Sequence, residues 1–156
     1  MNAKGHLGLA LIVVFSIMSL LAKTDNYSLT IAIIVVALST LPDIDLKFEI
    51  KHRGITHNIL AGFVFGLLFG VLFEYSRIGF WIGFLGGFGG TLLHIIGDIL
   101  TYMPFAPLAP FCNKKFSLGL FESSDKAINN LFFNIGAITF IIYLMFVYAN
   151  VTKLLL

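Results

Sequence analysis

Histidine and aspartate side chains gather in two short polar segments of a chain that is otherwise strongly apolar. The first segment holds Asp43, Asp45, His52 and His57, the second holds His94 and Asp98, and His6 stands apart near the N-terminus. Ionisable groups in or near a bilayer cost free energy, so their presence there indicates a functional site. Imidazole and carboxylate groups are metal ligands, which makes metal binding the first chemistry to consider.

His94 and Asp98 are four residues apart in a segment with a helical pattern, so their side chains lie on one helix face. Such a pair can supply one imidazole nitrogen and one carboxylate oxygen to a single ion. Thr101, three residues further on, can hydrogen-bond a ligand from behind. A polar contact between helices gives the same pattern, and the pair by itself leaves both interpretations open.

Asp43 and Asp45 are separated by one residue and precede His57. Two carboxylates so placed rarely have one role: one can bind a metal while the other orients a ligand or accepts a proton. An aspartate that follows a proline, here Pro42, is also a common turn or cap residue. The combination with His57 and the later histidine–aspartate pair favours a metal site over a turn.

The ligand types favour zinc among common ions, because mixed histidine and aspartate ligands suit a four-coordinate Zn²⁺. Ligand type alone leaves Mn²⁺ and Fe²⁺ open. Asp43, His57, His94 and Asp98 are predicted to bind one ion. His6 is predicted to bind a second ion or to complete the first site. A metal-bound water has its pKa lowered to about 7 and becomes a nucleophile at neutral pH.

Three further residues near this site are candidates for supporting roles. The planar fork of Arg53 suits a phosphate group, although an arginine at a membrane face also serves as a positive anchor. His52 can act as a ligand, a proton shuttle or a headgroup contact, and the sequence does not choose among these. Asn129 opens the last apolar stretch and can hydrogen-bond the site or cap a helix.

The composition requires a membrane. Of 156 residues, 58% are hydrophobic and 12% are charged, whereas soluble domains carry about 25% charged residues. We expect a single integral membrane domain over residues 1–156. The net charge of +2 gives no indication of nucleic-acid binding. A single cysteine excludes an intramolecular disulfide and a cysteine-based zinc site, and we interpret Cys112 as a small buried hydrophobe.

Five apolar stretches, residues 7–22, 28–41, 55–73, 78–103 and 128–149, predict an all-α, polytopic helical bundle of about five helices. The last three are long enough to span, and the first is slightly short. The second is distinctly short and ends at Pro42, so it either crosses by including flanking residues or stops partway in the membrane, with Asp43 and Asp45 at its tip. The first is long for a signal peptide, so we expect a retained helix. Glycines repeat every four residues from 62 to 70 and from 79 to 87, which predicts close helix packing. Residues 104–125 hold three prolines and predict a loop or re-entrant segment.

With five spans and an internal N-terminus, seven of the ten lysines and arginines fall in internal segments and three in external ones. The positive-inside rule therefore predicts a cytoplasmic N-terminus and an external C-terminus. In that topology His6, both early aspartates, His57 and the His94–Asp98 pair all lie toward the cytoplasmic face. The candidate ligands therefore lie on one side of the membrane. The count of lysines and arginines fixes only the orientation of the chain, so this convergence is an independent result.

The motifs of this chain resemble those of the YdjM family of inner-membrane metal-dependent hydrolases, which are multi-helix prokaryotic membrane proteins assigned largely by motif. The resemblance covers residues 1–112, and these motifs carry it: His6, Leu41-Pro42-Asp43-Ile44-Asp45, His52-Arg53-Gly54-Ile55-Thr56-His57 and His94-x3-Asp98-x2-Thr101. It implies a metal-dependent hydrolase in the cytoplasmic membrane.

That family is distantly similar to the zinc-dependent phospholipase C and P1-type nuclease group of helical phosphodiesterases. Their main zinc is held by an Asp, a His about fourteen residues later and an H-x3-D helix, and Asp43, His57, His94 and Asp98 match this set. A further zinc there uses an early histidine, the terminal amine and the helical Asp. His6 and Asp98 match two of these, whereas Met1 lies five residues before His6, so we do not expect amine ligation. No histidine follows His94, so we expect one or two ions.

The expected function is a membrane-embedded hydrolase in which zinc-activated water attacks a phosphoester, plausibly of a phospholipid or lipid-linked substrate entering from the inner leaflet. Asp45 would orient a ligand or act as general base, Arg53 would steady the phosphate, and His52 would assist. The alternative is a metal-binding regulator or scaffold without catalysis. An ion-conducting protein ranks last, because its ionisable groups would occur at several depths. The sequence does not predict an oligomeric state.

Overall fold

The computed structural model of the protein describes residues 1–46 and 53–155, and all its regular elements are helical. The elements are α1 (Ala3–Leu20), α2 (Asn26–Leu38), the 3-10 helix η1 (Leu41–Leu46), α3 (Ile59–Tyr75), α4 (Phe80–Ile99) and α5 (Lys126–Leu155). Within these described residues no β-strand occurs, and pairing is limited to two isolated bridges between residues 101 and 121. The predicted all-α bundle of five helices is confirmed.

Four helical segments have the length and apolar composition to cross a membrane: Ala3–Leu20, Asn26–Asp45, Phe80–Ile99 and Lys126–Asn150. The second apolar stretch reaches spanning length by including flanking residues, which was one of its two expected possibilities, whereas the third falls short of the spanning length expected for it. The second qualifies because η1 continues it as far as Asp45, whereas α3 has only 17 residues. Helix α3 begins at Ile59, since the residues just before it belong to a polar turn rather than to the helix.

Polar side chains fix where the helices begin. Asn2, Asp25 and Asn58 each accept a hydrogen bond from a backbone N–H in the first turn of α1, α2 and α3 respectively. Asp125 does the same at α5, where it accepts from the N–H groups of Ala127 and Ile128. The donated N–H of Ser28 also holds the pKa of the exposed Asp25 carboxyl below its usual range. Such N-caps satisfy donors that have no partner inside the helix.

Helix α3 packs along α4, and α1 packs along α5, while α2 lies against α4 and α1. The buried residues of α3 are its three repeated glycines, Gly62, Gly66 and Gly70, which face side chains of α4. In return, Gly83 and Gly87 of α4 lie directly against backbone carbonyls of α3. The predicted packing role is confirmed for the first repeat and for Gly83 and Gly87 of the second, because a side chain at these positions would push the helices apart. Gly79 instead precedes α4 with a positive φ, where a side-chain carbon would meet only Ile82.

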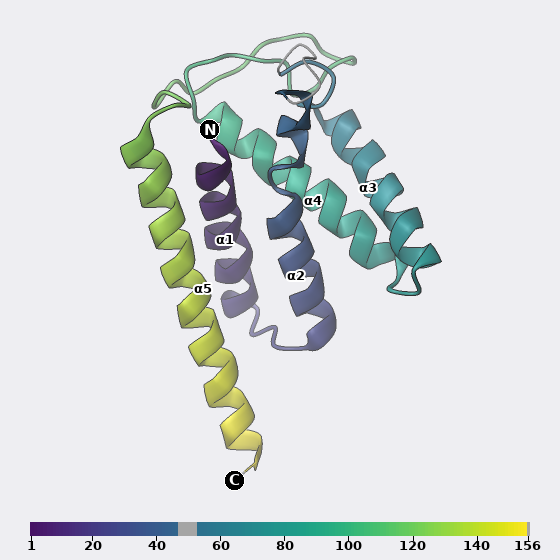
Figure 1. Ribbon diagram of the computed structural model, residues 1–156, viewed down its shortest axis with the longest axis vertical. Helices are drawn as coiled ribbons and strands as arrows, with labels where there is room; N and C mark the ends of the chain where they lie inside the picture. The colour runs from purple at the N-terminus through teal and green to yellow at the C-terminus, as the bar shows by residue number, and fades with distance from the viewer. Residues whose placement is uncertain (47–52, 156) are drawn as a thin grey trace.

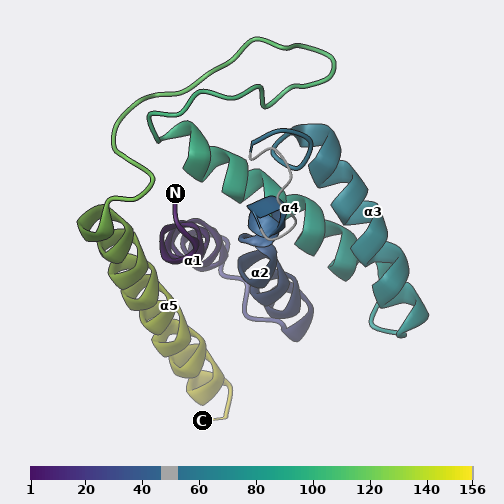
Figure 2. The ribbon, with the colours of Figure 1, turned by 45° about the horizontal axis from the view of Figure 1, so that its top comes forward.

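The five helices bring their polar ends together at one end of the bundle. Figure 1 shows the N-terminus of α1, the C-terminal end of α4, the start of α5 and the short helix after α2 at the same end. Figure 2 shows the long irregular segment between α4 and α5 running across this end. The proline-rich segment is therefore a loop. Cys112 lies in it and is exposed, so the interpretation of this cysteine as a buried hydrophobe was wrong.

Candidate metal centre

Four side-chain atoms from three separate segments converge on one point: Asp43 Oδ1, His57 Nε2, His94 Nε2 and Asp98 Oδ2. The two Nε2 atoms are 3.1 Å apart, and Asp43 Oδ1 lies 3.5 Å from His57 Nε2 and 3.4 Å from His94 Nε2. Asp98 Oδ2 lies 3.5 and 3.7 Å from the same two nitrogens. A tetrahedral zinc with bonds of 2.0–2.1 Å separates its ligand atoms by about 3.4 Å. These five separations are close to that value, and Asp43, His57 and His94 form one group able to hold a metal ion.

The hydrogen bonds on the far side of each imidazole ring determine which nitrogen faces this point. His94 Nδ1 lies 2.8 Å from the carbonyl oxygen of Ser39, which can only accept, so Nδ1 carries the proton. His57 Nδ1 lies 2.8 Å from Thr56 Oγ1, whose own proton is donated to Asp45 Oδ2 at 2.8 Å. With each ring neutral and its proton on Nδ1, Nε2 presents a lone pair.

Lone pairs and carboxylate oxygens alone would repel one another at these distances, so the site fits a cation. Two imidazole nitrogens face each other, with a carboxylate oxygen on either side. The side chains of His57, His94 and Asp98 are at most 2% exposed, whereas Asp43 is 19% exposed. Buried Asp98 Oδ2 has no hydrogen-bond partner among the described residues. This donor set suits zinc, and the open edge of the site lies at Asp43.

The 3-10 helix η1 separates the roles of its two aspartates. Asp43 lies on the Nε2 side of the His57 ring, while Asp45 Oδ2 lies 3.3 Å from Nδ1 on the other side. Asp45 is 1% exposed and reaches the ring together with the hydroxyl of Thr56. A carboxylate that accepts from the far nitrogen of a histidine fixes the tautomer and orientation that metal binding needs.

The other oxygen of Asp98, Oδ1, lies close to three nitrogen atoms, two of which belong to cations. The α-amine of Met1 lies 2.6 Å from it, Arg53 Nη2 lies 2.9 Å away, and His6 Nε2 lies 3.3 Å away. We did not expect the amine to bind a metal, and that stays a prediction; the structure shows the amine in contact with Oδ1 of the candidate ligand Asp98. Asp98 thus joins two differently charged surroundings through its two oxygens.

A family model described as YdjM inner membrane protein matches residues 1–155 of the chain. The chain belongs to this family. The match extends past the predicted limit of residue 112 and takes in the loop after α4 and all of α5 up to Leu155. No curated protein and no solved structure matches the chain. Membership, together with four helices apolar enough to span, identifies an inner-membrane protein that sits in a lipid bilayer.

His6 lies beside the four converging atoms and forms a second group with His94 and Asp98 that is able to hold a metal ion. Its ring stacks on that of His94, with centroids 3.7 Å apart, and both of its nitrogens are buried with no hydrogen-bond partner among the described residues. A side-chain carbon at Gly97 would come within 2.8 Å of His6 Nδ1. Gly97 therefore makes room for His6, a role that only the helix packing reveals.

Arg53 is buried and holds Asp98 from the side opposite the four converging atoms. Its Nη2 donates to Asp98 Oδ1 and to Thr101 Oγ1 at 3.0 Å, and its Nη1 donates to the carbonyl of Met103 at 2.6 Å. The backbone φ of Arg53 is +59°, a region that side-chain-bearing residues rarely adopt. Such a conformation costs free energy and persists only where its surroundings enforce it.

The remaining predicted residues have the following places. Thr101 accepts from Arg53 and donates to the backbone carbonyl of Asp98, so it supports the site through Arg53 rather than through a ligand's side chain. Asn129 Nδ2 donates to the carbonyls of Ser123 and Asp125, and its Oδ1 accepts from the N–H of Asn2. It joins α1 to α5. His52 lies outside the described residues.

Proposed function

We propose that this protein is a metal-dependent hydrolase of phosphoesters, with Zn²⁺ held by Asp43, His57, His94 and Asp98. The observation that carries the proposal is the convergence of two imidazole lone pairs and two carboxylate oxygens at separations of 3.1–3.7 Å. Zinc bound there would polarise a phosphoryl oxygen and lower the pKa of a bound water to about 7. His6 would hold a second ion or complete the surroundings of the first.

The residues around the ligands would have distinct tasks in this reaction. Asp45 and Thr56 would hold the His57 ring with its lone pair toward the ion. Asp45 would also accept a proton during the reaction. Arg53 uses three of its five N–H groups within the protein, which leaves two for phosphate oxygens. One of these, on Nε, is buried with no partner among the described residues.

A second candidate, a metal-binding protein without catalysis, is favoured by the number of ligands. Four protein ligands closing a tetrahedron are typical of structural zinc, whereas catalytic zinc keeps a position for water. Asp43 decides between the two, because it is the ligand with an exposed side chain, at 19%. Hydrolysis requires that water or substrate reach the ion at this edge, by a shift of Asp43 or by expansion to five ligands.

We place the site at the cytoplasmic face of the membrane. The arrangement of lysines and arginines predicts an internal N-terminus, and the N-terminus lies at the same end of the bundle as the four converging atoms (Figure 1). A cysteine-accessibility test with a membrane-impermeant reagent at the exposed Cys112, which lies in the loop across this end, would measure the orientation. Labelling only after the membrane is opened supports the cytoplasmic assignment.

The function is tested by measuring metal content and ester hydrolysis on the detergent-purified protein. Wild type, His94→Ala and Asp25→Asn are loaded with zinc and assayed with a phosphomonoester and a phosphodiester. Asp25 caps α2 at the opposite end of the bundle, and asparagine caps as well as aspartate, so this variant is the matched control. We expect turnover by wild type and Asp25→Asn that a chelator abolishes, and none by His94→Ala.

The outcomes separate the two candidates. Stoichiometric zinc without turnover of any ester by wild type supports the non-catalytic role and contradicts hydrolysis. Turnover that survives both the chelator and His94→Ala would show that the reaction takes place elsewhere. Wild-type protein that binds no zinc, Mn²⁺ or Fe²⁺ would contradict both candidates, because each depends on the same four ligands.

A further inference from the structure

An apolar cavity of about 870 Å³ opens beside the metal centre, between the start of α3 and the loop that follows α4. Leu60, Ala61, Val64 and Phe65 of α3 form one wall, and the loop contributes Met103, Pro104, Phe105, Ala106, Ala109 and Pro110. Its volume is within the roughly 300–1,000 Å³ typical of small-molecule sites. No motif in the sequence pointed to this cavity, because its two walls come from segments about forty residues apart.

The cavity is in direct contact with the metal centre through two of its lining residues. Arg53 lines the cavity and donates to Asp98 Oδ1 at 2.9 Å. Thr56 lines it and lies 2.8 Å from His57 Nδ1. A molecule bound in the cavity therefore lies one side chain away from two of the four candidate ligands.

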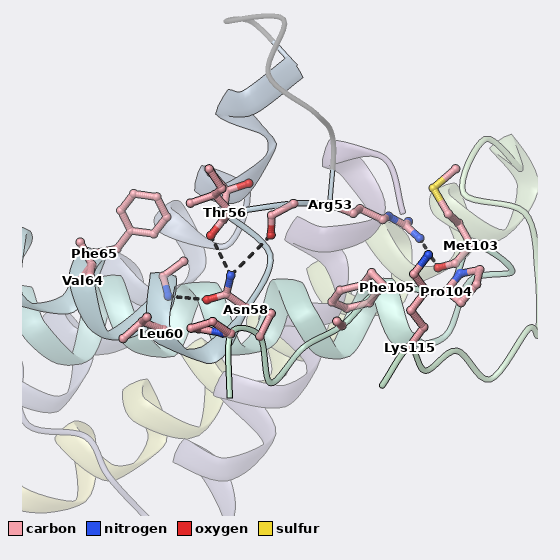
Figure 3. Close-up of a pocket in the computed structure, with 16 residues that line it drawn as sticks. Arg53, Thr56, Asn58, Leu60, Val64, Phe65, Met103, Pro104, Phe105 and Lys115 are labelled. Carbon is pink, nitrogen blue, oxygen red and sulfur yellow. Dashed lines mark hydrogen bonds between the residues drawn. The ribbon is translucent and has the colours of Figure 1, made fainter. Parts of the chain in front are cut away.

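Charge is distributed unevenly along the cavity. Its two charged lining residues, Arg53 and Lys115, are both cations, and none of the lining residues is acidic. Figure 3 shows both cations on the side of Met103 and Pro104, with Val64 and Phe65 at the opposite side. The cavity thus has a positive end next to Asp98 and an uncharged end along α3.

The uncharged end is open to the surroundings of the helices. Leu60 is 40% exposed and Val64 is 53% exposed, and both lie on the outer face of an α-helix whose buried residues are glycines. In a bilayer such a face contacts hydrocarbon. The cavity, called the groove below, therefore connects the hydrocarbon region of the bilayer, where lipid chains lie, with its own positive end, where a phosphate is attracted.

We propose that this groove binds a membrane lipid that carries a phosphate ester, with the phosphate at Arg53 and Lys115 and the hydrocarbon chain against Leu60, Val64 and Phe65. The proposal rests on the proposed function, and it names the substrate class and a specificity-determining residue, Lys115. The chain anchors the substrate along α3, and the paired cations fix the phosphate beside Asp98. A lipid held in this way has its phosphate beside Asp98, one side chain away from the metal centre, without leaving the bilayer.

The test uses phosphonates, because their carbon–phosphorus bond resists hydrolysis and binding is then measured without turnover. Zinc-loaded protein in nanodiscs is titrated with hexadecylphosphonate and with methylphosphonate. Val64→Trp fills the groove, while Val71→Trp alters another exposed valine two turns along α3 that does not line it. Lys115→Ala removes a cation of the cavity, while Lys114→Ala removes its exposed neighbour, which does not line it.

We expect Val64→Trp to weaken hexadecylphosphonate binding by about tenfold or more and to leave methylphosphonate unchanged, because only the chain loses its place. Lys115→Ala should weaken both ligands by a similar factor, because both carry the phosphonate group. Val71→Trp and Lys114→Ala should alter neither. In a separate measurement that needs no variant, hexadecylphosphonate with a photoreactive diazirine in its chain should label the segment from Leu60 to Phe65 of wild type.

The proposal is overturned if Val64→Trp and Val71→Trp have equal effects, or if the label appears outside the groove. Equal hydrolysis of long-chain and water-soluble esters, unaffected by Val64→Trp, would leave hydrolysis standing and remove the lipid groove. Specific phosphonate binding in a protein that hydrolyses no ester would do the reverse. The failure of one proposal can therefore be distinguished from the failure of the other.

Discussion

The two oxygens of Asp98 lie in opposite surroundings, although they belong to one buried carboxylate. Oδ2 faces the lone-pair nitrogens of His57 and His94, with no hydrogen-bond donor within reach among the described residues. Oδ1 faces the Arg53 guanidinium and the Met1 amine, both of which donate to it. The Oδ2 side therefore needs a positive charge from outside the chain, whereas the Met1 amine and Arg53 already supply positive charge on the Oδ1 side.

This difference assigns separate roles to the two sides. An ion on the Oδ2 side completes a set of donors that otherwise repel, while cations on the Oδ1 side hold the carboxylate in the orientation that the ion requires. A second ion near His6 would compete for Oδ1 with groups that are already positive. We therefore expect the Oδ2 side to bind the tighter ion, and changes on the two sides to have effects of different size.

The largest effect on zinc affinity is expected when one histidine on each side of Asp98 is replaced in turn by alanine. His57→Ala removes a ligand on the Oδ2 side and should lower zinc affinity by more than the roughly 100-fold that outer groups contribute. His6→Ala, the matched change on the Oδ1 side, should retain the ion. Competition titration with a zinc-selective chelating dye measures both. Equal losses would mean that the two sides do not differ as described.

A smaller effect is expected from Arg53→Met, which removes the cation on the Oδ1 side. Asp98 then loses a donor that orients it, and zinc affinity should fall by about 10–100-fold. Arg77→Met is the control, because Arg77 shares the positive φ of Arg53 but is exposed at the far end of the bundle. An unchanged affinity in Arg53→Met would show that Asp98 is positioned by other contacts.

Thr56→Val tests the support of His57 on the Oδ2 side. The change removes the hydroxyl that joins Asp45 to His57 Nδ1, and we expect a loss of zinc affinity of about tenfold. Asp45 Oδ2 remains 3.3 Å from the ring, which limits the loss. Thr30→Val, in an exposed turn of α2, serves as control. A loss as large as that of His57→Ala would make Thr56 itself part of the ion's surroundings.

The smallest effect on zinc is expected from Gly97→Ala. The added methyl group would meet the His6 ring and displace it from its stacking position on His94. Zinc affinity should change by less than about tenfold, because no ligand of the principal ion moves. A larger loss would mean that His6 binds the principal ion, and the two oxygens of Asp98 would then not have separate roles.

The sequence predicted the helices and their common polar end because both depend on local patterns. Apolar stretches separated by polar turns define spans, and alternating spans place His6, His57 and the His94–Asp98 pair at one end. The start of the third helix was misjudged, and the crossing of the second stretch was left open, since an N-cap at Asn58 and a 3-10 continuation are details of individual turns. Asp43 and His57 lie in these turns.

Other features required the packed structure. Gly97 looks like any helical glycine until the His6 ring is seen against it, and the division of labour between Asp43 and Asp45 depends on the direction of a short 3-10 helix. Arg53 was expected to bind a phosphate or to serve as a positive anchor at the membrane face, and the structure shows that it donates to Asp98 and Thr101. Each of these contacts joins residues more than ten positions apart, which local pattern cannot specify.

The central claim is that the four converging atoms bind one metal ion, and the most direct measurement is the metal content of the purified protein. Wild-type protein, loaded with zinc and dialysed against metal-free buffer, is analysed by elemental mass spectrometry beside an Asp43→Ala, His57→Ala double variant. We expect about one tightly held zinc per wild-type chain and about none in the variant. Equal zinc in the two proteins, or none in wild type, would contradict it.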